Sequence, residues 1–211
     1  EGRGSDLFEV FALLRQRYPN LEMVVRSAVP AKVKARHEGM ANLRIIDQPI
    51  PREALEQEYQ MADIFVIPTY GTVPYTILEA MSYELPVVTI DSWANTEYVA
   101  DGKTGLMARR STRVPAFCAN TFQPNFLAAD FREAQRVPDP DMVADLASKV
   151  ALLIESPELR RQQGRAARWE VEHGKFSLAR MNEKLGRVFD EAIGQEQASG
   201  QVYPTGLPQA R

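Results

Sequence analysis

The residues best suited to chemistry lie in one loop and the helix expected after it, in the segment YGTVPYTILEAMSYELP from Tyr70 to Pro86. Gly71 in the loop lets the backbone approach a ligand closely, and Thr76 and Glu79 fall in the first turns of the helix. The start of a helix has free N–H groups and a partial positive charge, which together bind anions, above all phosphate. A carboxylate one turn further in suits the paired hydroxyls of a ribose. The pattern therefore favours a nucleotide diphosphate.

The same segment also has a structural interpretation. In it the helix only packs against its neighbours, and Glu79 is a first-turn charge that complements the helix dipole. The residues of this stretch, taken alone, leave both interpretations open.

Apolar runs flank this helix, at Ile64–Pro68 before the loop and Val87–Ile90 after the helix. Similar short runs at 21–25, 43–46 and 105–108 alternate with helical patterns. Continuous apolar strands that alternate with helices are typical of parallel sheets covered on both faces. The sequence therefore predicts an α/β fold with a doubly wound parallel sheet. The loop after residue 68 would then lie at the carboxyl edge of the sheet, where such folds bind ligands.

The remaining segments suggest how the chain is organised. A helix is expected from Ser5 onward with no strand ahead of it, so the first strand is expected to be truncated and the chain to be a piece of a longer protein. Residues 109–138, with prolines at 115, 124 and 138, interrupt the rhythm and are interpreted as an irregular insertion. Helices are expected again at about 141–155, 158–173 and 177–193, and residues 194–211 as a flexible tail.

Composition narrows the classes of function. A net charge of −3 argues against a general nucleic-acid-binding protein, and the single Cys118 argues against a disulfide framework. No metal site is expected, because His37 and His173 lie far apart and are interpreted as surface or helix-end residues. Asp139-Pro-Asp141 has the spacing of a metal-binding pair, but its position ahead of a helix predicts an N-cap. No apolar run reaches the length of a membrane span.

Four ordered motifs carry a resemblance to a known family. They are Arg3-Gly-Ser-Asp-Leu-Phe8, Pro51-Arg-Glu-Ala-Leu55, the segment from Ala62 to Thr89 and the run Glu97-Tyr-Val-Ala-Asp-Gly-Lys-Thr-Gly-Leu106. Together they resemble the C-terminal half of family 4 (group 1) glycosyltransferases. The resemblance covers residues 1 to about 193, apart from the insertion at 109–138.

The resemblance implies a GT-B fold, in which two Rossmann-like domains face each other across a cleft. Residues 1–193 would be the C-terminal, nucleotide-sugar-binding domain, and the N-terminal acceptor domain would be absent from this chain. The implied enzyme is a retaining transferase that moves a hexose from a UDP- or GDP-sugar to a glycan, lipid or small-molecule acceptor. It would need no cofactor and no metal. The implied location is cytoplasmic, with peripheral association at the inner face of a membrane as an alternative.

The family's site residues transfer to matching positions of this sequence. Glu79 matches the second glutamate of the E-x7-E pair, which holds the ribose hydroxyls of the donor. Tyr75 and Thr76 match positions that contact the pyrophosphate, and Arg3 stands where the family has a lysine on the same phosphates. Ile50 matches a position whose backbone contacts the base. The motifs assign no catalytic residue.

Two positions depart from the family pattern. Gly71 stands where the family has the first glutamate of the pair, a contact to the donor sugar, and Pro74 stands where a glycine is common. Nucleotide binding remains the expectation, whereas handling of the donor sugar is in doubt. The alternative is a degenerate, non-catalytic nucleotide-binding or assembly module. A nicotinamide-dependent dehydrogenase is disfavoured, since no G-x-G-x-x-G follows any expected strand.

Overall fold

The structure, a computed structural model, describes residues 5–70, 75–92, 94–114 and 137–199. The chain divides into two compact units, residues 1–168 and residues 169–211. The elements of the first unit, up to the helix that crosses the division, are α1 (Ser5–Arg17), β1 (Met23–Arg26), α2 (Ala31–Arg36), β2 (Leu43–Ile46), α3 (Arg52–Met61), β3 (Phe65–Ile67), α4 (Tyr75–Ser82), β4 (Val87–Ile90), α5 (Asn95–Tyr98), β5 (Gly105–Ala108), α7 (Pro140–Glu155) and α8 (Pro157–Glu172).

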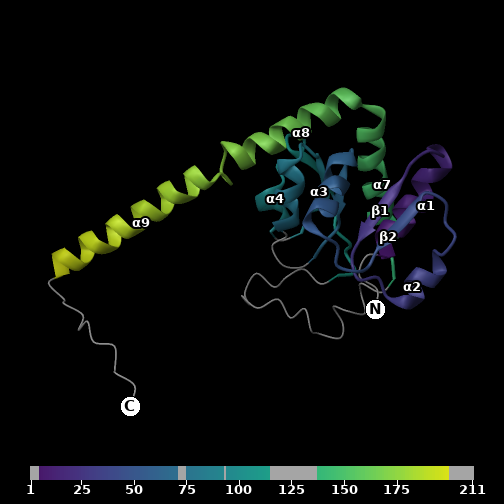
Figure 1. The fold of residues 1–211 in the computed structure, drawn as a ribbon, viewed down its shortest axis with the longest axis horizontal. Helices are drawn as coiled ribbons and strands as arrows, with labels where there is room; N and C mark the ends of the chain where they lie inside the picture. The colour runs from purple at the N-terminus through teal and green to yellow at the C-terminus, as the bar shows by residue number, and fades with distance from the viewer. Residues whose placement is uncertain (1–4, 71–74, 93, 115–136, 200–211) are drawn as a thin grey trace, which may run out of the picture. The chain divides into compact units, whose positions relative to one another are not determined.

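All of these strands pair in parallel, which confirms the predicted α/β architecture. They form two groups: β1 pairs with β2, and β3, β4 and β5 pair in that order (Figure 1). In the first group Met23 lies opposite Leu43, and in the second Phe65 lies opposite Val87. The sheet is therefore Rossmann-like in connectivity, with no direct pairing between β1 and β3.

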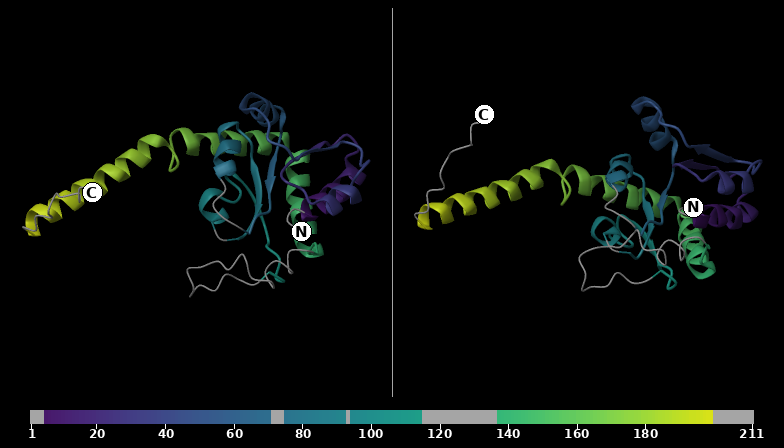
Figure 2. Two further views of the ribbon diagram at one scale, coloured as in Figure 1. Left: turned by 60° about the horizontal axis from the view of Figure 1, so that its bottom comes forward. Right: turned by 90° about the horizontal axis from the view of Figure 1, so that it is seen from below.

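Helices lie on both faces of the strands (Figure 2). On one face, Arg36 of α2 forms an ion pair with Glu9 of α1 at 3.4 Å. On the other face, Arg44 of β2 donates to Glu58 of α3 at 2.7 Å. The helices α1 and α2 thus share one face and α3 takes the other, which is the doubly wound arrangement that the sequence predicts.

The core is centred on α7, which packs against α1 and against β4 and β5. Its apolar residues recur at helical spacing, and Leu146 and Leu153 are fully buried. On the strand side, Val88 and Ile90 of β4 are also fully buried. This packing fixes the strands whose carboxyl ends form the floor of the site.

Helix α8 lies against the turns that lead into the strands of the second group. Gln163 is buried and its Nε2 donates to the Gly102 carbonyl at 3.2 Å. Gly164 faces the Glu84 carbonyl so closely that an added Cβ would lie 2.0 Å from that oxygen. Glu84 itself has a φ of 60° and follows the end of α4. The contact therefore requires a residue without a side chain at position 164.

The second unit contains the end of α8 and the helix α9 (Leu178–Ser199). The Ser177 hydroxyl accepts from the Arg180 amide at 3.3 Å and so caps the start of α9. Helix α9 continues to Ser199, six residues beyond the end expected at 193, so residues 194–199 are helical. Within the described residues, no helix is long and apolar enough to cross a membrane.

Candidate functional site

The candidate site begins at the mouth of α4, beyond the carboxyl end of β3. Tyr75 and Thr76 form the first turn of α4, and both are exposed, Tyr75 to 75%. The first-turn amides of α4 have no partner within the helix, which makes this end suited to an anion. Three of the predicted site residues, Arg3, Gly71 and Pro74, lie outside the described residues.

Glu79 lies one turn into α4 and is exposed, with its side chain held from α3. The Tyr59 hydroxyl donates to Glu79 Oε2 at 3.3 Å. The Tyr59 ring stacks on Tyr83 with centroids 5.2 Å apart and an interplanar angle of 11°. Burial, followed by the negative charge of Glu79, raises the pKa of Tyr59 to about 12. Tyr59 is therefore a neutral donor at physiological pH, and it orients a carboxylate that still has free acceptor capacity.

The loop that carries Ile50 leads directly into α3. Ile50 is partly buried, and Arg52 follows it at the start of α3. The hydrogen bond to Glu56 raises the pKa of Arg52, and the charge of Glu79 adds to this effect. Ile50 and Glu79 are linked through α3, whose Tyr59 hydroxyl donates to Glu79 at 3.3 Å.

The floor of the site is fixed by two buried polar side chains that sequence reasoning missed. Asn95 is 1% exposed, and its Nδ2 donates to the Thr69 carbonyl at 2.9 Å and to the Ile90 carbonyl at 3.1 Å. Thr89 is fully buried and donates from its hydroxyl to the Ile67 carbonyl at 2.7 Å. These bonds hold the carboxyl ends of β3 and β4 together. For Thr89 the signal in the sequence was a polar residue inside the apolar run Val87–Ile90, whereas Asn95 had no such signal.

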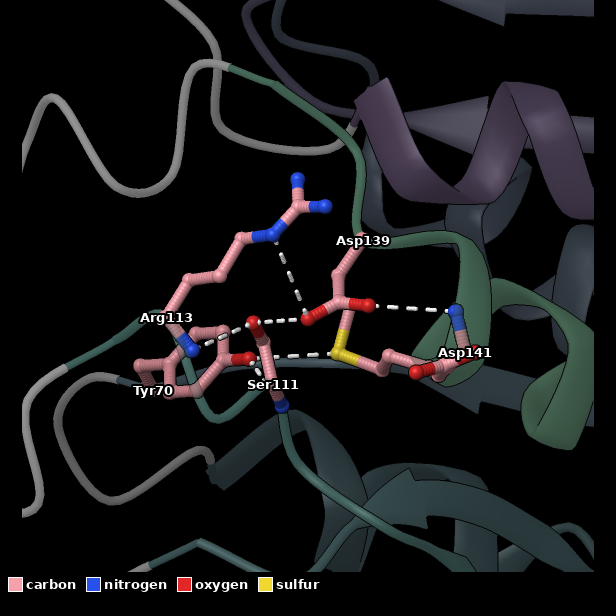
Figure 3. A network of polar contacts seen from close by, with 6 residues as sticks. Tyr70, Ser111, Arg113, Asp139 and Asp141 are labelled. Carbon is pink, nitrogen blue, oxygen red and sulfur yellow. Dashed lines mark hydrogen bonds and ion pairs between the residues drawn. The ribbon is translucent and has the colours of Figure 1, made fainter.

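A second polar network joins the loops after β3 and β5 to the start of α7 (Figure 3). The buried Tyr70 hydroxyl accepts from the Ser111 amide at 2.8 Å and contacts Met142 Sδ at 3.1 Å. The Ser111 hydroxyl donates to Asp139. Sequence analysis singled out neither Tyr70 nor Ser111 for this role.

Asp139 confirms the predicted N-cap and adds a charge to this network. Its Oδ1 accepts from the Asp141 amide at 3.1 Å, and Arg113 lies 4.0 Å from its Oδ2. The hydrogen bond from Ser111 lowers the pKa of Asp139, so this carboxyl is ionised at neutral pH.

Asp6, in the first turn of α1, faces this network, and its pKa shifts in the opposite direction from that of Asp139. Burial raises the pKa of Asp6 to about 6, and the charges of Asp139 and Glu9 contribute to the increase. The folded state therefore binds a proton at Asp6 more tightly than the unfolded chain, whose Asp pKa is about 3.9. The contribution of Asp6 to the free energy of unfolding is therefore fully present below about pH 4, and it is lost as the pH rises through about 6.

We therefore expect Asp6→Asn to stabilise the protein at pH 7 by about 1–3 kcal/mol, because the substitution removes a poorly solvated charge. At pH 4 the two proteins should differ little. Urea unfolding of both proteins at pH 4, 5, 6 and 7 measures this difference. Asp190→Asn, at an exposed position of α9, is the control. A stability difference that does not change between pH 4 and pH 7 would refute the assignment.

The structure thus unites Tyr75, Thr76 and Glu79 on one helix and places Ile50 in the loop that leads into α3, the helix whose Tyr59 contacts Glu79. In the part of the chain that the structure describes, no group of three or more His, Cys, Asp or Glu residues is arranged to hold a metal ion. Hydrogen-bond acceptors, exposed amides and aromatic rings at a carboxyl edge are suited to a nucleotide. They do not by themselves provide a nucleophile or a general base.

Comparison with known families decides the identity of the chain. The sequence pattern of the family described as glycosyl transferases group 1 matches residues 4–122, more than half of the chain. The chain belongs to this family. The matched residues include β1 to β5 and every predicted donor-binding residue except Arg3, so this group 1 glycosyltransferase chain carries the segment in which the candidate site lies. Among curated proteins, none matches the chain.

Solved structures share the fold of this group 1 glycosyltransferase chain at low sequence identity. The C-terminal domain of a group 1 family protein from Francisella tularensis is 16% identical with a TM-score of 0.58, and the match covers 79% of this chain and 76% of that one. Anabaena HepE, solved with UDP and glucose, is 12% identical with a TM-score of 0.63, covering 90% of this chain and 45% of HepE. The pneumococcal O-GlcNAc transferase GtfA, solved with UDP and GlcNAc, is 14% identical with a TM-score of 0.63, covering 91% of this chain and 33% of GtfA.

These matches show that the chain has the fold of a GT-B C-terminal domain. The chain spans less than half of the length of HepE and of GtfA. The predicted resemblance to the C-terminal domain of group 1 glycosyltransferases is therefore confirmed.

Proposed function

We propose that this chain is the donor-binding domain of a retaining glycosyltransferase and that it binds a nucleoside diphosphate sugar at the mouth of α4. The observation that supports this most is the position of Glu79. It is exposed one turn inside α4 and oriented by the Tyr59 hydroxyl at 3.3 Å, and Tyr59 lies on the helix that follows the loop of Ile50. A carboxylate held in this way is suited to accept hydrogen bonds from the two hydroxyls of a ribose.

The other groups take positions along the same ligand. The first-turn amides at Tyr75 and Thr76 would bind the pyrophosphate, with Arg3 as a further cation, and the backbone at Ile50 would contact the base. In transfer, negative charge develops on the leaving diphosphate. Preorganised amides stabilise that charge, and each such contact contributes on the order of 2–4 kcal/mol. We propose UDP as the diphosphate and a hexose as the sugar.

The acceptor would be a glycan, a lipid or a small molecule held by an N-terminal domain. We therefore expect these 211 residues to bind nucleotide without transferring sugar. The cytoplasm, with peripheral attachment to the inner face of a membrane as the alternative, is the proposed location.

Calorimetric titration of the chain with UDP, GDP and ADP tests this proposal. We expect one of the three diphosphates to bind at sub-millimolar concentration and the preferred base to identify the donor. The matching nucleoside monophosphate is the control, and it should bind more weakly because it presents fewer phosphate oxygens to the helix mouth. Absence of binding by all three diphosphates at millimolar concentration would contradict the proposal.

A degenerate, non-catalytic module is the second candidate, because Gly71 replaces the first glutamate of the pair. The substitution Gly71→Glu in the full-length protein separates the two candidates. If the site is intact, we expect sugar transfer to change by less than about tenfold, or ~1.4 kcal/mol. A rise well beyond tenfold would favour a decayed site. The same substitution should leave the affinity for the diphosphate unchanged, since the ribose and phosphate contacts lie at other residues.

A further inference from the structure

Arg26 is the last residue of β1 and lies at the carboxyl edge of the sheet. Its side chain is exposed, and within the part of the chain that the structure describes it takes part in no hydrogen bond or ion pair. Arg44 of β2, by contrast, forms two hydrogen bonds with Glu58. A guanidinium has N–H donors and no acceptor, so the donors of Arg26 are available to a ligand.

The pairing of β1 with β2 places Arg26 beside the loop of Ile50. The two strands are parallel neighbours, and Arg26 lies opposite Ile46, the last residue of β2 (Figure 1). Paired strands are about 4.8 Å apart. The loop that contains Ile50 begins immediately after Ile46. Arg26 is therefore one strand away from the start of the loop to which the proposed function assigns the base.

Arg26 also belongs to the face of the sheet that α3 covers. Residues two apart on a strand share a face, so Arg26 and Val24 lie on the same side of β1. Val24 lies opposite Arg44, and residues at one level of neighbouring strands point to the same face. Arg44 donates to Glu58 of α3 at 2.7 Å, which identifies this face as the one under α3.

A cavity of about 1320 Å³ extends from the end of β1 to the mouth of α4. Its lining includes Arg26, Tyr59 of α3, Thr69 after β3 and Thr76 in the first turn of α4. The positive charge of Arg26 opposes the increase in the pKa of Tyr59 that burial and Glu79 cause. Arg26 thus lines the same cavity as the tyrosine that orients the proposed ribose ligand.

A guanidinium at this place is suited to the edge of a nucleobase. With the ribose on Glu79 and the diphosphate at Thr76, the base is the part of the ligand that extends toward the Ile50 loop. Arginine is always charged and only donates hydrogen bonds. Uracil and guanine present a ring carbonyl oxygen, an acceptor, where adenine presents an amino group, which is a donor. Two donors that face each other cannot form a hydrogen bond, so Arg26 favours a base with a carbonyl at this edge.

We propose that Arg26 determines base specificity at the nucleotide site: its guanidinium donates to a ring carbonyl oxygen of uracil or guanine and disfavours adenine. The proposal rests on the proposed function, because the position of the base follows from Glu79 and the Ile50 loop. It adds a side chain that distinguishes bases to a site in which the other predicted contacts serve the ribose and the phosphates.

Calorimetric titration of UDP, GDP and ADP into the parent chain, Arg26→Met and Arg26→Lys tests the proposal. Methionine keeps much of the length of the side chain and removes its donors, whereas lysine keeps the charge without the planar fork. Arg187→Met, at an exposed position of α9, is the matched control. Urea unfolding checks that each variant is folded, and we expect all of them to be as stable as the parent because both positions are exposed.

We expect the parent to bind UDP or GDP at least about tenfold more tightly than ADP. Arg26→Met should lose at least about tenfold in affinity for the preferred diphosphate and less than about threefold for ADP, so that the preference nearly disappears. Arg26→Lys should lose less than Arg26→Met for the preferred diphosphate, since its ammonium still donates to one oxygen. Arg187→Met should bind like the parent.

Three results would overturn the proposal while the nucleotide site itself stands. They are a loss by the same factor for all three diphosphates in Arg26→Met, which would place Arg26 on the phosphates or the ribose, unchanged affinities in that variant, and a parent that prefers ADP. Absence of binding by the parent would overturn the proposed function together with this inference. The two failures are therefore distinguishable.

Discussion

Replacing Gly164 by alanine is expected to destabilise the protein by about 1–3 kcal/mol, despite the higher helix propensity of alanine. The added Cβ would lie 2.0 Å from the Glu84 carbonyl oxygen and 2.9 Å from its carbon. Both atoms belong to the backbone of a turn with a positive φ, so the turn cannot yield without strain. The helix or the turn would have to shift, and the buried Gln163 contact with Gly102 would shift with it.

Gly186→Ala in α9 is the matched control, because an added Cβ at that position would meet nothing within 4 Å. We expect this variant to keep or gain stability, by up to about 1 kcal/mol. Urea unfolding followed by circular dichroism compares both variants with the parent chain. If Gly164→Ala proves as stable as the parent, α8 does not pack closely on this turn.

The parts of the fold that local patterns determine were predicted from the sequence. The strands β2, β4 and β5 have the predicted bounds, because each is a short apolar run between turn residues. The N-cap at Asp139 was also predictable from proline placed at the start of a helix. By contrast, the end of α9 was placed too early, since the Gln, Glu and Ala residues of the last turns suit both a helix and a tail.

Contacts between distant segments were not predictable. Ser111 binds Tyr70, 41 residues away, and Asp139, 28 residues away, and no local pattern relates them. His37 ends α2, which agrees with its interpretation as a surface or helix-end residue, but no local pattern indicates that it is buried against Phe8 with ring centroids 4.5 Å apart.

Within the site, the order of motifs identified the helix mouth and Glu79 but not what holds Glu79 in place. Tyr59 lies 20 residues earlier and has no motif of its own. It reaches Glu79 because α3 packs beside α4, and its ring stacks on Tyr83, the residue that follows α4. Orientation of a site residue by a neighbouring helix is a property of the packing, and spacing in the sequence does not reveal it.

Glu79→Ala is expected to weaken binding of the preferred nucleoside diphosphate by about 1–3 kcal/mol, or 5- to 150-fold, because it leaves two ribose hydroxyls without their acceptor. Glu79→Gln should lose less, since its amide oxygen still accepts one hydrogen bond. Glu158→Ala, at an exposed carboxylate on α8, is the matched control and should bind like the parent.

Calorimetric titration of UDP, GDP and ADP into these four proteins is the most direct test of a nucleotide site at the mouth of α4. We expect the parent and Glu158→Ala to bind one diphosphate equally, Glu79→Gln to bind it less tightly and Glu79→Ala to bind it least. Equal affinity of Glu79→Ala and the parent would show that the ribose lies elsewhere and would contradict the proposed site.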